Sequence, residues 1–342
     1  MTWKEFYTQL KNGAPQGVYL FAGPEEFVKR EALAALANAL LPEGMEALNR
    51  ADLEGATAAQ IIDAAETLPL LCERRLVTVC DWGPLLSGKA RGEEDDASRM
   101  LAYLDNAPAT CVLVFYVHGE ADGRKKLTAA LKKRGVEVRF EPLTDAELLR
   151  WANARLRPLG KSVSQQAVSH LAFTAGRDLT RLSGEIDKLA DYIGARGEIQ
   201  VEDIEAVVSP SLEFSVFEML DFLFAGDLTR AERSLNALLT GGQNCVGVLA
   251  MLIRQLRMLS HLALAQRAGG NTTAVEKALK LHPYAAKRAA RQARQMDADA
   301  LSKLYTQAVE ADFAVKSGRL RDSEALQFFM LQIAARGTKR PS

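Results

Sequence analysis

Cysteine is scarce in this sequence, with four residues in 342. The cysteines form no C-x-x-C pair, whereas a structural zinc site needs four closely spaced ligands. Free thiols in a reducing compartment are therefore the expected state of Cys72, Cys80, Cys111 and Cys245. No metal site and no cofactor are predicted.

The sequence patterns of common hydrolases are missing as well. Neither the H-E-x-x-H pattern of zinc peptidases nor the G-x-S-x-G turn of serine hydrolases occurs. The four histidines, which are His118, His170, His261 and His282, are scattered along the chain. A lone histidine is more often structural than catalytic, so the sequence predicts no catalytic residue.

Long apolar runs and a net charge are also lacking. The longest apolar runs, such as VLVFYV (112–117), fall far short of the roughly 20 residues that cross a bilayer. The opening MTWKEF has no basic region followed by an apolar stretch, so we expect no signal peptide and a cytoplasmic location. Lys plus Arg and Asp plus Glu both number 43, but from Leu212 onward 18 basic residues outnumber 12 acidic ones. This imbalance permits a basic patch rather than a strongly basic nucleic-acid domain.

The first 142 residues alternate between strand and helix patterns. Runs typical of strands cover 18–23, 46–52, 76–81, 111–117 and 136–142, and helical patterns cover 25–40, 57–68, 96–106 and 124–134. This alternation predicts an α/β domain with a parallel sheet and helices on both faces. The stretch 83–96, which contains the acidic run Glu93–Asp96, is predicted to be a solvent loop.

After Pro142 the sequence predicts helices only. Helical patterns cover 144–158, 164–173, 178–192, 201–208 and 214–336, the last with breaks at glycines and at His282–Pro283. We therefore expect three domains, which are an α/β domain (1–142), a small helical domain (143–211) and a larger helical domain (212–342). The first two resemble the AAA+ arrangement of a nucleotide-binding core followed by a helical lid.

The first strand-to-helix turn matches only part of the phosphate-binding loop G-x-x-x-x-G-K-[ST]. Gly23 fits the first glycine, and Lys29 fits the lysine. Val28 stands where the second glycine should be, and Arg30 replaces the hydroxyl that would bind magnesium. The turn is therefore a degenerate P-loop, and we expect it not to bind ATP.

The departures from the pattern have physical consequences. Valine resists the backbone geometry that turns amide groups toward phosphates, and Glu25 and Glu26 add negative charge there. The strand 76–81 ends in Asp81, where a Walker B strand carries its magnesium-binding acid, but Trp82 follows instead of the catalytic acid. A plain strand–turn–helix, in which both glutamates favour the helix N-terminus, accounts for the same residues.

Six segments spread almost from end to end carry a resemblance to a known family. They are YLFAGPEEFVKREAL (19–33), LPLLCERRLVTV (68–79), DGRKKLTAALKKRG (122–135), GRDLTRLSGEIDKLADYI (176–193), RQLRML (254–259) and HPYAAKRAARQA (282–293). No segment is specific alone. In their order, spacing and total length the sequence resembles the delta subunit of the bacterial DNA polymerase III clamp loader, and the degenerate P-loop agrees with that family.

The resemblance implies a non-ATPase subunit that binds the sliding clamp (beta) and opens it for loading onto primed DNA during DNA replication. It implies two AAA+-like domains and an all-α collar that assembles a five-membered ring with delta prime and the tau/gamma ATPases. The chain would belong to a DNA-directed DNA polymerase holoenzyme whose nucleotidyltransferase activity lies in another subunit, away from any membrane. The alternative is an AAA+-type ATPase that acts on nucleic acid, and Val28 and Arg30 argue against it.

In this family two hydrophobic residues at the tip of a helix before the third strand contact the clamp. Leu70 and Leu71 fill that place here, although the family often has an aromatic residue at the second position. Pro69 is expected to end the preceding helix, and Arg74 and Arg75 could meet acidic residues of the clamp. From the residues alone, the two leucines could instead close the edge of the core.

A second candidate surface is basic. Lys287, Arg291 and Arg294 are spaced i, i+4 and i+7 and so share one helix face, with Arg288 close beside them. Such a face could contact DNA phosphates in the assembled ring without reading sequence. A solvated or subunit-facing helix is the alternative.

Overall fold

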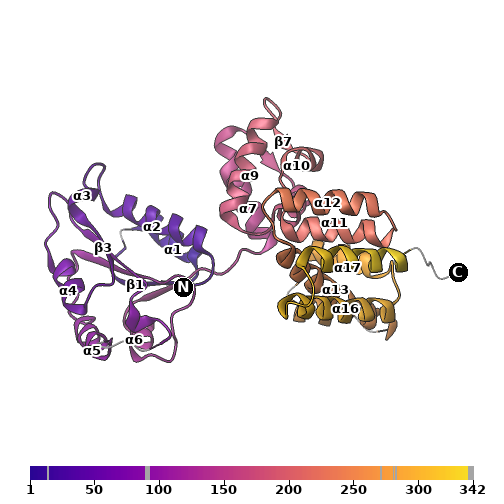
Figure 1. The fold of residues 1–342 in the computed structure, drawn as a ribbon. Coiled ribbons are helices and arrows are strands. Elements are labelled where there is room, and N and C mark those ends of the chain that lie inside the picture. Colours follow the sequence, from indigo (N-terminus) through magenta and orange to yellow (C-terminus); the bar gives the residue numbers. More distant parts are fainter. Residues whose placement is uncertain (14, 89–92, 270–271, 280, 282, 338–342) are drawn as a thin grey trace. The chain divides into compact units, whose positions relative to one another are not determined.

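The computed structural model describes residues 1–13, 15–88, 93–269, 272–279, 281 and 283–337 (Figure 1). The chain forms two compact units, Met1–Thr144 and Asp145–Ser342, and each has a hydrophobic core of its own. The first unit is an α/β unit and the second is largely helical, as the sequence predicts. The boundary expected near residue 211, between the two helical domains, stays a prediction.

A five-stranded parallel sheet forms the centre of the first unit, with the strand order β2-β3-β4-β1-β5. The strands are β1 (Gly17–Ala22), β2 (Arg50–Glu54), β3 (Arg75–Cys80), β4 (Cys111–Tyr116) and β5 (Val136–Arg139). The three central strands are buried along almost their whole length. Strands that are buried on both faces have continuous apolar sequences, which is why the sequence predicts these three strands.

Helices cover both faces of this sheet (Figure 1). They are α1 (Trp3–Asn12), α2 (Glu26–Leu40), α3 (Glu46–Asn49), α4 (Ala58–Glu66), α5 (Glu93–Tyr103) and α6 (Lys126–Arg134), with a 3₁₀ turn η1 (Gly83–Leu85). Val18 and Leu20 of β1 belong to the core that α4, α5 and α6 share with the sheet. Tyr19 and Phe21 point to the opposite face, where their rings lie 5.8 and 5.1 Å from that of Phe6 on α1.

Two details of the sequence prediction are wrong in this unit. The run 46–52 is not a strand throughout, because its first four residues form the helical turn α3 and strand β2 begins at Arg50. The acidic run Glu93–Asp96 does not lie in a loop but forms the first turn of α5. Carboxylates are favourable there because they face the positive end of the helix dipole. Residues 89–92 of the predicted loop lie outside the described residues.

The second unit begins with short helices and a small pair of strands. The elements are α7 (Asp145–Leu156), η2 (Arg157–Leu159), β6 (Ser162–Val163), α8 (Gln165–Ala175), α9 (Leu179–Tyr192), β7 (Glu198–Ile199) and α10 (Val201–Val207). Strands β6 and β7 pair in parallel, which corrects the expectation that strands stop at Pro142. Two-residue strands are too short to leave an alternating pattern in the sequence.

The remaining described residues fold mainly into longer helices. These are α11 (Leu212–Phe224), α12 (Leu228–Thr240), α13 (Cys245–Arg267), α14 (Thr273–Ala278), α15 (Pro283–Ala293), α16 (Ala298–Lys316) and α17 (Asp322–Gly337). The helical reading of 214–336 is confirmed in outline. Two of its predicted break residues, Gly270 and His282, lie outside the described residues.

Helix α13 runs through the core of this helical unit. By length and composition it could cross a membrane, but half of its most apolar window is buried inside the unit. Leu252, Leu256 and Leu259 are fully buried in the same cluster as Leu301 and Leu304 of α16. Burial among neighbouring helices therefore accounts for the apolar character of α13.

Candidate functional site

The degenerate P-loop lies at the carboxyl end of β1, the edge of a parallel sheet where ligands usually bind. Gly23 has a φ of +125°, and a Cβ atom there would lie 2.4 Å from the carbonyl oxygen of Phe140. Its N–H donates to the carbonyl oxygen of Gly119. The glycine is thus required by close backbone packing within the unit, whether or not a phosphate is bound.

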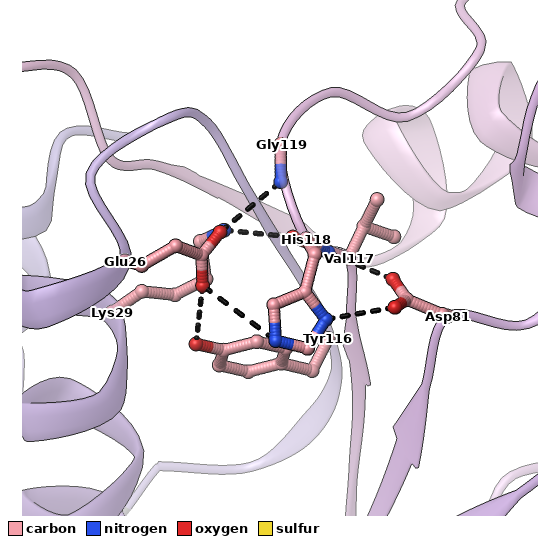
Figure 2. Close-up of polar contacts among 7 residues, drawn as sticks. All are labelled: Glu26, Lys29, Asp81, Tyr116, Val117, His118 and Gly119. Atoms are coloured by element: carbon pink, nitrogen blue, oxygen red, sulfur yellow. Dashed lines mark hydrogen bonds and ion pairs between the residues drawn. The ribbon is translucent and has the colours of Figure 1, made fainter. Parts of the chain in front are cut away.

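Lys29 fills the place of the phosphate-binding lysine, but its side chain is fully buried. Its Nζ donates to Glu26 Oε1 at 2.6 Å and to the carbonyl oxygen of Val117 at 2.7 Å. The residues involved are drawn in Figure 2. The ammonium also lies 5.1 Å from the centre of the Tyr116 ring. The charge of Lys29 is therefore compensated by groups of the chain itself.

The Glu26 carboxylate lies at the centre of these contacts (Figure 2). Besides the Lys29 ammonium, it accepts the Tyr116 hydroxyl at 2.9 Å and the N–H of Gly119 at 3.1 Å. Partial burial alone would raise the pKa of Glu26, but the hydrogen bonds from Lys29, Tyr116 and Gly119 outweigh it and lower the pKa below its ordinary 4.5. The carboxylate thus meets a lysine and a backbone N–H, the kinds of group that bind phosphate in a complete P-loop.

The position of the Walker B acid is also engaged within the chain. Asp81, in a left-handed conformation with a φ of +44°, accepts the backbone N–H of His118 at 2.8 Å, and its other oxygen lies 2.7 Å from His118 Nδ1. The other ring nitrogen of His118 is 3.9 Å from Glu26 (Figure 2). Trp82 is buried, donates to the carbonyl oxygen of Ala56 and stacks on a core phenylalanine.

Gly23, Lys29 and Asp81 thus all contact the segment 117–119 that follows β4, and the interpretation of this region as a degenerate nucleotide site stays a prediction. Val28 is buried in the first turn of α2, whereas Arg30 is exposed. Sequence reasoning missed Tyr116 and His118. The available signal was their place at the carboxyl end of an apolar central strand, next to the strand that ends at Asp81.

The predicted clamp-binding pair lies in the loop between α4 and β3. Helix α4 ends at Glu66, somewhat before Pro69. Leu70 is 53% exposed and Leu71 77% exposed, so neither side chain closes the core edge of this unit. Leu71 has a φ of +59°, a left-handed conformation that is unusual for leucine.

The two arginines after this pair are not equivalent. Arg75 is buried at the start of β3, so its predicted contact with a partner's acidic residues is wrong for the chain as it stands. Arg74 donates through its guanidinium to the carbonyl oxygen of Pro15 at 2.6 Å. This bond ties the end of the loop to the turn before β1.

The basic face lies on and just beyond α15. Lys287, Arg291 and Arg294 are exposed and line a cavity of about 700 Å³ together with Glu205 and His170. Burial lowers the pKa of His170; the nearby Glu205 opposes this effect and the Arg288 guanidinium adds to it. The three cations therefore share one surface, as their spacing predicts.

Arg288 also lines this cavity, but its guanidinium is occupied differently from the other three. It lies 4.9 Å from the ring centre of Phe173 and 5.3 Å from that of Phe217, and the Phe214 ring is 5.8 Å away. Such stacking gives Arg288 a packing role between α8, α11 and α15. The structure separates it in this respect from its three basic neighbours.

No group of three or more potential metal ligands occurs among the residues that the structure describes. The four cysteines are free thiols. Burial raises the pKa of the Cys111 thiol to about 12, so this thiol is poorly suited to metal binding or nucleophilic attack.

Comparison with known proteins matches two family models to this chain. The model described as "DNA polymerase III, delta subunit" matches residues 19–141, and the model described as "DNA polymerase III delta subunit, C-terminal domain" matches residues 213–333. Each compact unit of the structure contains one of the two matches.

Individual relatives agree with these matches. The chain is 27% identical over 340 residues to the DNA polymerase III subunit delta of Bacillus subtilis (strain 168), which covers 98% of both chains. It is 28% identical over 133 residues to the corresponding subunit of Escherichia coli (strain K12), or 39% of this chain and 38% of that one. The solved structure of the Bacillus subtilis DNA clamp loader delta protein aligns with a TM-score of 0.63 and 27% identity over 98% of this chain and 100% of that chain.

Removal of the Glu26 carboxylate should destabilise the α/β unit, because it leaves the Lys29 ammonium buried without its anionic partner. Breaking a fully buried pair costs about 3–5 kcal/mol, and because Glu26 is partly exposed we expect roughly 2 kcal/mol for Glu26→Ala. Acetate should fill the vacated position and raise the melting temperature of Glu26→Ala more than chloride does at equal ionic strength.

Glu26→Gln is the matched control, because its side chain leaves no room for acetate, so acetate and chloride should affect its melting temperature equally.

The difference in stability between the parent and Glu26→Ala should also narrow as the pH falls below 4.5. The lowered pKa of the Glu26 carboxyl contributes stability that is lost when the carboxylate is protonated. Equal melting temperatures for the parent and Glu26→Ala at pH 7 would contradict the assigned role.

Proposed function

Because the chain belongs to the delta-subunit family of the bacterial DNA polymerase III clamp loader, we propose that it binds the sliding clamp and opens it for loading onto primed DNA. Opening requires that the chain bind the open form of the clamp more tightly than the closed form, because equal affinity shifts no equilibrium. The chain itself contributes binding rather than catalysis, and nucleotidyl transfer lies in another subunit of the holoenzyme.

The exposed pair Leu70 and Leu71 carries this proposal. Large apolar side chains that are more than half exposed at a loop tip favour a partner's apolar pocket. Leu68 in the same loop is 77% exposed and enlarges the apolar surface. We assign the clamp contact to this loop, with Leu70 and Leu71 as its centre.

The internal contacts of Lys29 support a subunit that does not use ATP. A nucleotide bound as in a complete P-loop would need the Lys29 ammonium, which Glu26 and the carbonyl oxygen of Val117 already hold. We therefore assign ATP binding to partner subunits, the tau/gamma ATPases, and do not favour the alternative of an independent AAA+-type ATPase. The site of these contacts belongs to the AAA+-like domain, 1–142.

The helical unit supplies the remaining domains in this proposal, a lid (143–211) and an oligomerising collar (212–342). Apolar side chains that remain exposed on α16 and α17 suit contacts with other subunits, among them delta prime, in a five-membered ring in the cytoplasm. These side chains are Val309, Phe313, Phe328 and Leu331. Each is between 42% and 62% exposed, so none of the four is buried in the core of the helical unit.

The purified chain should show no saturable binding of ATP. Titration with a fluorescent ATP analogue and magnesium, followed by anisotropy, should give no plateau, because Lys29 and Asp81 are already paired. An ATPase subunit of the same loader serves as the positive control. A micromolar dissociation constant for the chain alone would contradict this prediction.

Replacement of Leu70 and Leu71 by serine should largely abolish clamp binding while folding and ring assembly are kept. Burying a leucine side chain contributes roughly 1.5–3 kcal/mol, so loss of both should weaken binding by about two to four orders of magnitude. The measurements are circular dichroism, assembly with the partner subunits and affinity for the cognate clamp.

Leu159→Ser is the control for this pair, because Leu159 is also exposed, at 55%, but lies in the helical unit. It should leave clamp affinity unchanged. Parent-like clamp binding by the Leu70→Ser, Leu71→Ser variant would place the contact elsewhere.

Reversal of Lys287, Arg291 and Arg294 to glutamate should weaken binding of the assembled loader to primed DNA. Each lost phosphate contact removes counterion release, so the dependence of affinity on salt should become shallower. Affinity is measured at several salt concentrations with the ring shown to be intact.

The control carries the same change of charge on other helices of the unit, with Arg233, Lys277 and Lys303 reversed to glutamate. These three residues are exposed on α12, α14 and α16. An unchanged salt slope in the α15 variant, or an equal change in the control, would mean that the α15 face does not contact DNA.

A further inference from the structure

Asn49 is a buried polar residue that lies next to the clamp-binding loop. It is the last residue of α3 and is fully buried, 21 residues before Leu70 in the chain. Its position, directly before strand β2, fixes it to the sheet. None of the sequence patterns singled it out.

The side-chain amide of Asn49 forms hydrogen bonds with both the N–H and the carbonyl oxygen of Leu70. Its Oδ1 accepts the N–H of Leu70 at 2.6 Å, and its Nδ2 donates to the carbonyl oxygen of Leu70 at 2.9 Å. The same Nδ2 donates to the carbonyl oxygen of Met45 at 3.2 Å. The amide thus pairs with the backbone of Leu70 as a neighbouring β-strand would, and three hydrogen bonds set its orientation.

These bonds fix the part of the loop from which the exposed leucines project. Between α4 and β3 the backbone forms neither helix nor strand, and Leu71 holds a left-handed conformation. Such a conformation is costly for a leucine and persists only where the surroundings enforce it. The bonds to Leu70 come directly before that residue, so they restrict the direction of both side chains.

We propose that Asn49 is a positioning residue for the clamp contact, an inference that rests on the proposed function. Its amide keeps the Leu70–Leu71 loop in the conformation that binds, so the clamp does not have to order the loop on association. Asn49 itself is buried and does not reach the partner. A loop released from Asn49 would populate the binding conformation only part of the time, and the apparent affinity would equal the intrinsic affinity multiplied by that populated fraction.

The kinetics of clamp binding separate this role from a contact role. Asn49→Ala should reduce the association rate constant by roughly ten-fold, because fewer molecules have an ordered loop, with little change in the dissociation rate constant. Biolayer interferometry of the full-length chain on the immobilised cognate clamp measures both constants. An association rate constant equal to that of the parent would overturn the proposal.

The chain offers a closely matched control in Asn153. Its Oδ1 accepts the N–H of Val163 and its Nδ2 donates to the carbonyl oxygen of Val163, both at 3.0 Å, in the helical unit. Asn153→Ala removes the same kind of bonds and should leave clamp association unchanged. An equal loss of association in Asn153→Ala would overturn the specific role of Asn49.

A double-mutant cycle distinguishes this inference from the proposed function. In the Leu70→Ser, Leu71→Ser background, Asn49→Ala should produce no further loss of clamp binding, because Asn49 acts through those residues. If the serine pair weakens binding while Asn49→Ala alone has no effect, the positioning role is wrong and the contact stands. If the serine pair has no effect, the proposed contact itself is wrong.

Hydrogen exchange tests the anchor even if Asn49→Ala fails to fold. In the parent chain the Leu70 amide should exchange at least roughly ten-fold more slowly than an unprotected amide, although its side chain is more than half exposed. Exchange at the unprotected rate would show that the bond to Asn49 is not kept in solution and would overturn the proposal.

Discussion

The ion pair between the buried Lys29 and the partly exposed Glu26 is the interaction on which the edge of the α/β unit depends. A fully buried ammonium is tolerated only with an anion and further hydrogen bonds, and Glu26 and the carbonyl oxygen of Val117 supply them. The same carboxylate holds the Tyr116 hydroxyl and the Gly119 N–H, so the carboxyl ends of β1 and β4 are joined through one side chain.

The Leu70–Leu71 loop lies at the opposite end of the same sheet. All five strands run in one direction, the ion pair follows their carboxyl ends, and the Leu70–Leu71 loop precedes the amino end of β3. Six residues of β3 separate the two ends by roughly 20 Å. The sheet can therefore carry a closed, ligand-independent edge and an exposed apolar edge without conflict.

The sequence predicted those features that depend on residues near each other in the chain. The buried strands β1, β3 and β4 are continuous apolar runs, and the position of Lys29 within its turn identified the degenerate loop. The Val117 carbonyl that Lys29 contacts lies 88 residues away and the Asn49 amide that contacts Leu70 lies 21 residues away, and no periodicity connects these partners. Arg288 has the spacing of a surface cation, yet rings contributed by α8 and α11 occupy its guanidinium.

Both ends of the sheet use the same physical device, a buried or partly buried side chain that satisfies the backbone of a neighbouring loop. Glu26 accepts the N–H of Gly119, and Asn49 accepts the N–H of Leu70. Such loops are ordered by the fold itself, so binding a partner does not incur the full entropy of ordering them.

In a nucleotide-dependent ATPase, loops that become ordered only when the ligand binds act as a conformational switch. A chain whose loops are already ordered has a fixed binding surface. Such a surface can favour one shape of a ring-shaped partner over another only through a difference in its affinity for the two shapes. In the function proposed above, the internal ion pair of Lys29 and the exposed leucines are compatible with each other, because that proposal assigns the control by nucleotide to other subunits.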